Sequence, residues 1–190
     1  MPALTRTCSL ALLAISCLYG SLVAAADRQF QGPYFDNDRL RIVLIPRTPE
    51  QMAAFYEARG FPPEALERIR QTCFITVHIE NKGDEVLWLE LENWQFSSGN
   101  RPLARLDQAY WQSQWDAIEL PQSKRSTFGW TQLPPVRDLQ PAEPVGGNVV
   151  LPGTVSSVNI EAVFHSGADR QGETIRLGFG QVPCSKGVQP

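Results

Sequence analysis

Residues that commonly bind transition metals are scarce in this chain. Its 190 residues include four cysteines, two methionines and two histidines, His78 and His165. A zinc or copper site usually needs three or four converging nitrogen or sulfur ligands. The two histidines lie in different segments with no ligand spacing between them, and the spaced Asp/Asn loop of a calcium site is missing. We therefore expect neither a metal site nor a cofactor.

The sequence also lacks a recognisable catalytic motif. It has no Gly-x-Ser-x-Gly segment, and its Gly146-Gly147 pair lacks the lysine and the helix of a phosphate-binding loop. Glu90 and Glu92 are two residues apart in an alternating segment, so their carboxylates can share one strand face, as an acid/base pair requires. Alternation alone also produces a solvated outer face there. An enzyme with a dispersed carboxylate site is therefore only the third functional hypothesis, and we assign no catalytic residue.

No run of basic residues is present either. The chain has 17 Lys and Arg against 20 Asp and Glu, a formal net charge of −3, which argues against nucleic acid as a partner. Hydrophobic residues make up 43% of the chain and charged residues 19%, a composition too apolar for intrinsic disorder. The length suits one domain with a core of its own.

The one long apolar stretch lies at the amino terminus. Residues 1–26 carry one basic residue, Arg6, near their start, continue with an apolar centre and end in three small residues, Ala24 to Ala26, as a secretory signal peptide does. We predict cleavage near Ala26 and a periplasmic or secreted protein. An uncleaved membrane anchor and lipidation at Cys17 are the alternatives, although the stretch barely reaches the ~20 residues of a membrane span.

Removal of the leader leaves two cysteines, Cys73 and Cys184. An oxidising compartment favours a disulfide between them. Neither a Cys-x-x-Cys spacing nor a histidine at ligand spacing points to redox or metal chemistry. We therefore predict a structural disulfide, which would stabilise the fold by roughly 4–5 kcal/mol in the chain-entropy model.

A helical insertion is predicted at about residues 49–70, after a β-rich first strand. Thr48 can cap a helix whose first residue is Pro49, and Gln51 completes a capping box. Apolar residues then recur at helical spacing until Gly60, and a second short helical stripe follows. Two short helices are expected before the main sheet.

Strict alternation of apolar and polar residues predicts a first hairpin. Residues 73–80 alternate, a turn-forming segment follows, and residues 87–92 alternate again. Pairing the two apolar faces sets His78 opposite Trp88 on the outer face.

Further strands are predicted beyond this hairpin. Residues 158–164 and 175–179 alternate and are expected to form a second hairpin. Residues 125–131, which contain Phe128 and Trp130, are predicted as a strand. Residues 148–151 are predicted as another, shorter strand.

Together these elements predict a mainly β chain: a single immunoglobulin-like β-sandwich with a short two-helix insertion after the first strand. The strand that ends in the Asn81-Lys82-Gly83-Asp84 turn resembles those of exported bacterial immunoglobulin-like modules, a likeness confined to that hairpin and to the fold. The sandwich domain is placed at residues 39–190, after a lead-in over 27–38.

Aromatic residues concentrate in the middle of the sequence. The cluster contains Trp94, Tyr110, Trp111, Trp115 and Trp130. Such side chains anchor interfaces and stack on sugars or peptides, although they also fill cores. The aliphatic residues of the two predicted hairpins already supply an interior, so we predict that this cluster belongs to a recognition surface.

Two features adjoin this cluster. A short helix that begins at Asp107 would place Trp111 and Trp115 on one face. The Pro/Gly-rich loop at about residues 133–147 has an extended backbone preset by its prolines. It either binds a partner or lies as a strap across the sandwich, with Arg137 bonded to backbone carbonyls. Because the first alternative makes the loop a binding segment, Arg137 is included among the predicted binding residues.

These observations predict a non-catalytic binding or assembly-accessory protein of the cell envelope, whose partner is another envelope protein. The alternative is a small-molecule or carbohydrate-binding module that uses exposed tryptophans. Contact with a membrane is expected only through the leader, if it stays uncleaved.

Overall fold

The computed structural model describes residues 34–184; the predicted signal peptide, Cys17 and the first part of the predicted lead-in lie outside this range. Within it the chain forms two antiparallel sheets and four α-helices. The first sheet contains, in spatial order, β1 (Tyr34–Asp36), β2 (Leu40–Arg47), β3 (Thr72–Asn81) and β8 (Pro144–Pro152). The second contains β4 (Leu87–Glu90), β5 (Gln95–Ser98), β6 (Arg101–Pro102), β7 (Val136–Leu139), β9 (Ser157–Ser166) and β10 (Thr174–Pro183). The helices are α1 (Pro49–Glu57), α2 (Pro63–Arg70), α3 (Gln108–Asp116) and α4 (Gln122–Trp130), and a short 3-10 helix, η1 (Leu91–Asn93), separates β4 from β5.

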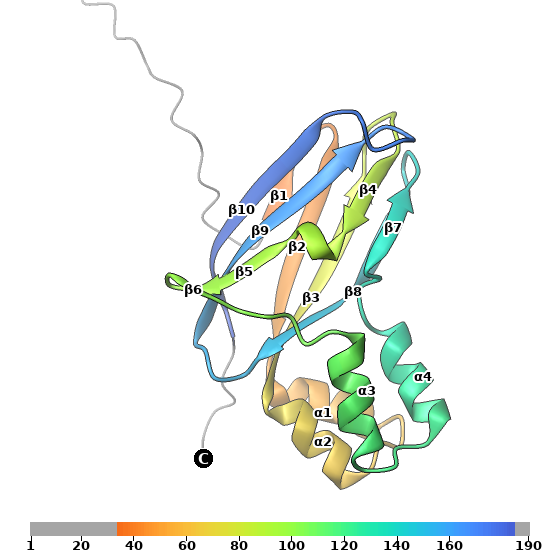
Figure 1. Ribbon diagram of the computed structural model, residues 1–190, viewed down its shortest axis with the longest axis vertical. Helices are drawn as coiled ribbons and strands as arrows, with labels where there is room; N and C mark the ends of the chain where they lie inside the picture. Colours follow the sequence, from red (N-terminus) through yellow and green to blue (C-terminus); the bar gives the residue numbers. More distant parts are fainter. Residues whose placement is uncertain (1–33, 185–190) are drawn as a thin grey trace, which may run out of the picture.

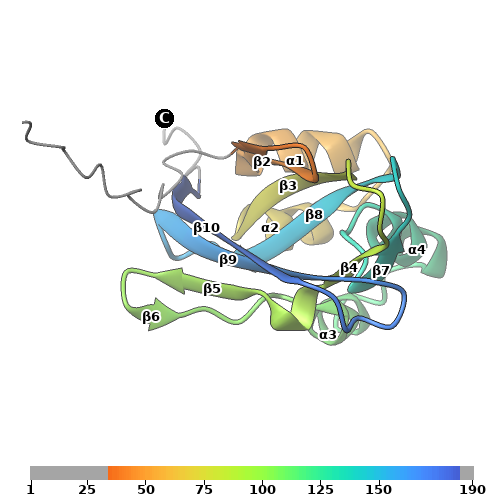
Figure 2. The same ribbon diagram turned by 90° about the horizontal axis from the view of Figure 1, so that it is seen from above.

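The two sheets face each other in a sandwich-like layout, and the helices gather at one end (Figures 1 and 2). In the second sheet the spatial order is β6-β5-β9-β4-β7, and β10 pairs with β9. The prediction of a mainly β, sandwich-like chain is confirmed at this level. None of the helices in the described range is long and apolar enough to cross a membrane.

The main hydrophobic core lies between the sheets. Ile75, Val77 and Ile79 of β3 are buried in it, whereas His78 between them is exposed, as the alternation predicts. β9 and β10 pair with Phe164 opposite Ile175, which confirms the second predicted hairpin.

The helical insertion is confirmed as α1 and α2. Thr48 caps α1: its hydroxyl accepts a hydrogen bond from the backbone N–H of Gln51, and the Gln51 side chain accepts one from the backbone N–H of Thr48. Pro63 begins α2. Gly60 has a φ of +72° in the turn that leads out of α1, a backbone conformation that glycine tolerates best.

The first predicted hairpin is wrong. β3 pairs with β2 and β8, while β4 pairs with β7 and β9, so the chain crosses from one sheet to the other between them. His78 lies opposite Val43 and Gly146, and Trp88 lies opposite Asp138 and His165. Alternation shows which face of a strand is buried, but two strands that face each other across a core alternate just as two paired strands do.

The prediction of a strand over residues 125–131 is also wrong, because this segment belongs to α4 and the turn after it. Phe128 is buried and Trp130 is exposed. In a strand these two residues would share one face, whereas residues two apart lie on nearly opposite sides of a helix, so the helix explains why one ring is buried and the other exposed.

The Pro/Gly-rich segment at 133–147 is more regular than the extended loop that the sequence predicted. It contains β7 and the first part of β8, which extends the strand predicted at 148–151. The chain before β7 lies directly on β8: a Cβ added at Gly147 would stand 2.3 Å from the backbone nitrogen of Leu133. Only glycine permits so close an approach.

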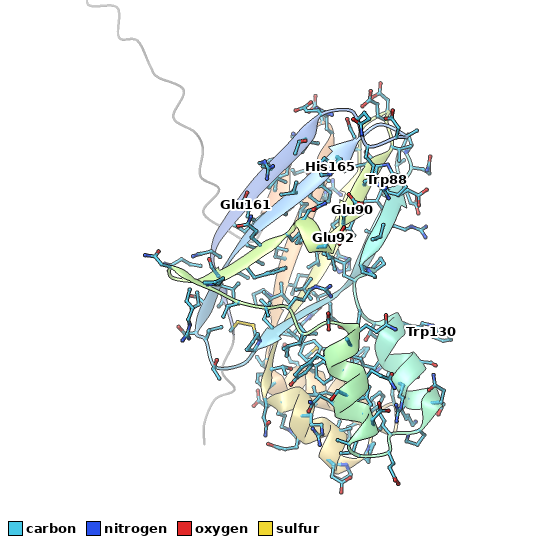
Figure 3. The ribbon with its side chains drawn as sticks, viewed as in Figure 1. Trp88, Glu90, Glu92, Trp130, Glu161 and His165 are labelled. Atoms are coloured by element: carbon cyan, nitrogen blue, oxygen red, sulfur yellow. A yellow bond between two sulfur atoms is a disulfide. The ribbon has the colours of Figure 1, made fainter. Side chains whose placement is uncertain are left out.

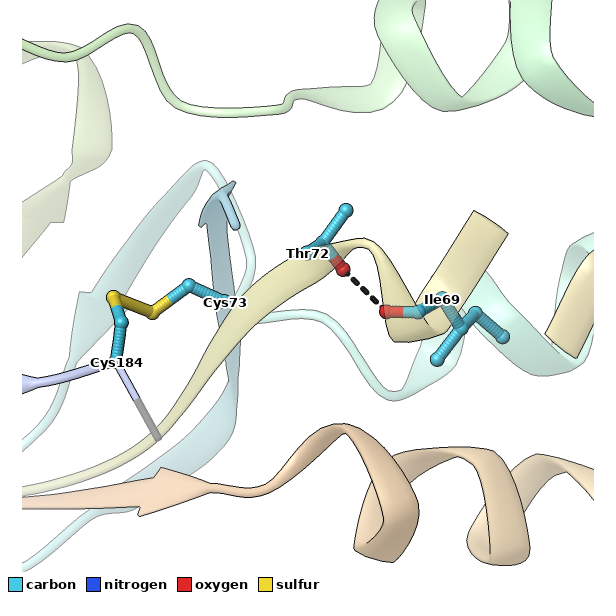
Figure 4. Close-up of a disulfide and its surroundings, with 4 residues drawn as sticks. All are labelled: Ile69, Thr72, Cys73 and Cys184. Carbon is cyan, nitrogen blue, oxygen red and sulfur yellow. Dashed lines mark hydrogen bonds between the residues drawn. A yellow bond between two sulfur atoms is a disulfide. The ribbon is translucent and has the colours of Figure 1, made fainter. Parts of the chain in front are cut away.

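Cys73 and Cys184 form a disulfide, as predicted, with their Cα atoms 5.3 Å apart. Cys73 lies at the start of β3 in the first sheet, and Cys184 directly follows β10 of the second, so the bond ties the two sheets together (Figure 4). Beside it the hydroxyl of Thr72 donates a 2.8 Å hydrogen bond to the carbonyl of Ile69, which joins the end of α2 to β3.

A second hydrophobic core lies between the helices and the outer face of the first sheet. Phe74 of β3 and Val150 of β8 belong to it, together with Tyr56 of α1, Ile69 of α2 and Phe128 of α4. The end of the first sheet is therefore covered on both faces, and this second core holds the four helices in place.

We predict that replacing both Cys73 and Cys184 by Ala lowers the free energy of unfolding by about 4 kcal/mol, because the bond closes a loop with a sequence separation of 111. Urea unfolding of the oxidised mature domain measures the loss. The wild-type protein unfolded in a reductant serves as the matched control and should show the same loss. A change below about 1 kcal/mol would show that this cross-link contributes little.

Candidate functional site

The predicted aromatic cluster divides into buried and exposed members. Trp94, Trp111 and Trp115 are buried in the two cores. Trp130 is 87% exposed and Tyr110 is 39% exposed. The cluster therefore supplies both core side chains and surface side chains.

Trp94 is a core residue of the sandwich. Its indole N–H donates a 3.2 Å hydrogen bond to the carbonyl of Val163, and its ring packs edge-on against Phe164 with the ring centres 5.6 Å apart. Its burial and its hydrogen bond account for its presence without any ligand.

Trp111 and Trp115 hold α3 against α4. Asp107 caps α3 as predicted, accepting a 3.0 Å hydrogen bond from the backbone N–H of Tyr110. The two tryptophans share the buried face, with their rings stacked at 4.8 Å. Phe128 of α4 packs against both, at 4.6 Å and 5.1 Å between ring centres.

A cleft of about 770 Å³ lies at this contact, bordered by α3, α4 and β8, and we call it the α3–α4 cleft. Trp111, Trp115 and Trp130 line it, and so do Pro134 and Pro135 from the predicted Pro/Gly-rich segment. The polar lining includes Arg105, Gln108, Gln112, Gln122, Gln132 and Asn148. The structure thus brings together part of the predicted aromatic cluster and part of the adjoining segment at one concave site.

Two buried donors at the cleft have no acceptor. The indole nitrogens of Trp111 and Trp115 are buried and make no hydrogen bond to any described residue. Buried polar groups in proteins are nearly always paired, and leaving one unpaired costs about 1–3 kcal/mol. By contrast, the indoles of Trp88 and Trp94 each donate to a backbone carbonyl. The unpaired donors are therefore confined to the tryptophans that line the cleft.

The two arginines of the cleft differ in their contacts. Arg125 forms an ion pair with Asp116 and also donates to the carbonyls of Leu120 and Trp115, at 2.6 Å and 3.2 Å. Arg105 is half-buried, and its guanidinium makes no hydrogen bond or ion pair within the described part of the chain. Burial lowers the pKa of Arg105, and the charge of nearby Asp107 partly offsets this effect.

A network of polar side chains lies beneath the cleft. The hydroxyl of Tyr56 lies 2.6 Å from the Thr131 hydroxyl, and the Gln132 amide donates to both. The Asn148 amide donates to the Thr131 carbonyl at 2.9 Å, and its oxygen accepts from Thr76. Burial raises the pKa of Tyr56 to about 12. The network fixes the end of α4 on β8 and so sets the position of Trp130.

Besides Trp94, two predicted binding residues, Tyr110 and Arg137, lie outside the cleft lining. Tyr110 points away from the shared face of Trp111 and Trp115, as the predicted helix requires, and its ring packs edge-on against Trp111 at 5.4 Å. Arg137 lies in β7 and forms an ion pair with the side chain of Glu143, so the predicted bonds to backbone carbonyls are wrong. The ion pair fastens the turn between β7 and β8.

The expected carboxylate pair is not on a common strand face, because β4 ends at Glu90 and Glu92 is exposed in η1. Glu90 is only 9% exposed. Its carboxylate lies 3.2 Å from Nε of Arg170 and 3.6 Å from Nδ1 of His165, and it accepts a 3.3 Å hydrogen bond from Asn93.

These contacts fasten the turn between β9 and β10 to β4. The Arg170 guanidinium lies 3.9 Å from the ring centre of Trp88, whose indole N–H donates a 3.0 Å hydrogen bond to the carbonyl of Gly167. In Figure 3, Trp88, Glu90 and His165 lie together on the second sheet, whereas Trp130 lies beside the helices. Among the described residues, no group of three or more His, Cys, Asp or Glu is arranged to hold a metal ion.

Sequence reasoning missed Arg105 as a cleft residue. It lies two residues before the cap of the predicted helix, and nothing in its spacing distinguishes it from the other arginines. Its position depends on Leu106, whose backbone N–H bonds to the carbonyl of Val150 in β8 at 2.9 Å. Only the packing of the chain before α3 on β8 brings Arg105 to the cleft.

We predict that two tryptophan substitutions differ strongly in their effect on the free energy of unfolding. Trp115→Ala should lower the free energy of unfolding by about 3–5 kcal/mol because it empties part of the second core. Trp130→Ala should change it by less than about 0.5 kcal/mol, since an exposed side chain loses little packing. Urea unfolding of both variants checks this. A large loss in Trp130→Ala would contradict the assignment of Trp130 to the surface.

We further predict that Tyr56 makes stability fall with rising pH. The unfolded phenol loses its proton near pH 10, whereas the buried phenol of Tyr56 keeps it until about pH 12. The contribution of Tyr56 to the free energy of unfolding is therefore fully present below pH 10 and is lost between pH 10 and about pH 12. Urea unfolding across this window should give a shallower slope for Tyr56→Phe than for wild type. Tyr110→Phe, at an exposed tyrosine, is the control, and equal slopes for all three proteins would refute the assignment.

Comparisons with known proteins yield one structural likeness. No protein family model and no curated protein matches the chain. A solved structure of ycdA, a proposed lipoprotein of Bacillus subtilis, superposes with a TM-score of 0.41 at 9% sequence identity. The superposition covers 79% of this chain but only 39% of that one. A likeness of this size assigns neither a family nor an activity to the chain.

Proposed function

We propose that the chain is a non-catalytic, exported binding protein of the cell envelope, and that it holds a small polar ligand, an oligosaccharide, in the α3–α4 cleft. The observation that carries the proposal is the exposed Trp130 ring at a cleft lined by glutamine and asparagine amides, behind which the indole N–H groups of Trp111 and Trp115 are buried without an acceptor. The sequence favoured binding of another envelope protein and offered carbohydrate binding as the alternative. This combination favours the carbohydrate alternative.

The size and the lining of the cleft support a small ligand. A volume of about 770 Å³ lies within the range of small-molecule sites. The glutamine and asparagine amides of the lining offer both donors and acceptors, which suits the hydroxyl groups of a sugar. The exposed Trp130 ring offers a flat apolar face on which a sugar ring can stack.

The surface elsewhere gives less support to a large protein partner. Among the described residues, the exposed large hydrophobic side chains are Tyr34, Tyr110, Trp130 and Val136. They come from β1, α3, α4 and β7, whereas a protein interface usually has a contiguous core of buried apolar and aromatic side chains.

Export is part of the same proposal. The leader-like residues 1–26 support secretion into the periplasm or the medium, with cleavage near Ala26. A disulfide that joins the two sheets suits an oxidising compartment. The same inter-sheet bond supports placing the sandwich in the immunoglobulin-like class.

The test is a titration of the mature domain with soluble oligosaccharides of two to six sugars, followed by intrinsic tryptophan fluorescence. We expect saturable binding by at least one member of the panel. Trp130→Ala should weaken it about 30-fold, the loss typical of a binding anchor.

Tyr34→Ala is the matched control, because it removes an exposed aromatic side chain that does not line the cleft. It should leave the affinity unchanged. Absence of saturable binding across the panel, or equal weakening by Tyr34→Ala and Trp130→Ala, would contradict the proposal.

A further inference from the structure

The charges of the α3–α4 cleft indicate what kind of sugar it takes. Two arginines and Asp107 are the charged residues of its lining. The Arg125 charge is already compensated by Asp116, and the Asp107 carboxylate already accepts the hydrogen bond that caps α3. Arg105 is thus the charged group of the lining whose hydrogen-bonding capacity is unused by the described residues.

A half-buried guanidinium without hydrogen-bond partners is unfavourable in a folded protein. Partial burial removes some of the water around its five N–H donors, and no carboxylate or carbonyl of the described residues accepts a hydrogen bond from them in its place. Burial accordingly lowers the pKa of Arg105. Planar carboxylates and other oxyanions satisfy a guanidinium through two parallel hydrogen bonds.

We propose that the α3–α4 cleft binds an acidic sugar whose negatively charged group, a carboxylate or a sulfate ester, pairs with the guanidinium of Arg105 while a sugar ring stacks on Trp130. This inference rests on the proposed function and adds the charge of the ligand to it. Arg105 and Trp130 line the same cleft, so one oligosaccharide can contact both.

Asp107 carries a negative charge close to the positive charge of Arg105. It lines the cleft, and its carboxylate acts on Arg105 electrostatically. An anionic ligand is therefore repelled by Asp107 while it is attracted by Arg105. Asn at this position keeps the hydrogen bond that caps α3, because Asn caps helices as well as Asp does. Asp107→Asn therefore removes the repulsion without loss of the cap.

The test compares three probes at low salt: an oligogalacturonate, its fully methyl-esterified neutral form, and a sulfated oligosaccharide of the same length. Wild type should bind at least one of the two acidic probes at least tenfold more tightly than the neutral ester, as a charge-assisted hydrogen bond predicts. The two acidic probes distinguish a carboxylate from a sulfate ester.

Three variants test whether Arg105 causes the preference for the acidic probe. Arg105→Gln should abolish the preference for the acidic probe, and Asp107→Asn should increase it a few-fold. Arg101→Gln, which removes the same charge from an exposed residue of β6 outside the cleft, should leave the preference unchanged. Thermal unfolding shows whether each variant is folded.

A measurement on the wild-type chain does not depend on the folding of any variant. Phenylglyoxal modifies accessible arginines, and mass spectrometry locates the modified sites. The acidic probe should protect Arg105 and leave Arg101 reactive. Protection of neither residue by a probe that binds, or an acidic preference that survives in folded Arg105→Gln, would overturn the inference.

The possible failures are distinguishable. Equal binding of the acidic and neutral probes would contradict the role of Arg105 but leave the cleft as a sugar site. Absence of binding by all three probes, together with the oligosaccharide panel, would contradict the proposed function itself.

Discussion

The arrangement of the whole molecule depends on two side chains that point out of the sandwich. Phe74 and Val150 lie on neighbouring strands of the first sheet, facing away from the core between the sheets, and each is 1% exposed. Leaving two such side chains in water would forgo roughly 1.5–3 kcal/mol each. The four helices cover them, so the end of the sandwich becomes a three-layer structure with a second core.

The α3–α4 cleft follows from how this cover is built. α1 and α2 are joined to the sheet by the chain itself, and Tyr56 of α1 also bonds to the segment after α4, whereas α3 meets α4 through the rings of Trp111, Trp115 and Phe128. The backbone before α3 and after α4 lies on β8 at the base of these two helices. Arg105 and Gln132 of those two segments line the cleft together with Pro134 and Pro135, so it offers both polar groups and apolar surface to a ligand.

Sequence reasoning predicted the parts of this arrangement that depend on neighbouring residues. The capped helix at Thr48, the helix starting after Asp107, the hairpin of β9 and β10 and the disulfide follow from local periodicity, capping or compartment. The partner of β3 did not follow, because alternation identifies a buried face and not the neighbour that covers it. Phe74 shows the same limit: it falls on the outer face by alternation, and only the helices packed on it explain its burial. Arg105 was missed since its place at the cleft depends on a backbone contact with β8, far away in the sequence.

The five tryptophans offer a direct test that the α3–α4 cleft is a binding site. Their indole N–H groups are separate probes: those of Trp88 and Trp94 are hydrogen-bonded, those of Trp111 and Trp115 are buried without an acceptor, and Trp130 is exposed. The decisive measurement is a 15N–1H correlation spectrum of the mature domain, assigned with single Trp→Phe variants and recorded during titration with the oligogalacturonate. Our account predicts that the indole signals of Trp111, Trp115 and Trp130 move with the titration while those of Trp88 and Trp94 stay in place. Saturable binding that moves only the Trp88 or Trp94 signal would contradict it, because the ligand would then occupy the sandwich and not the cleft.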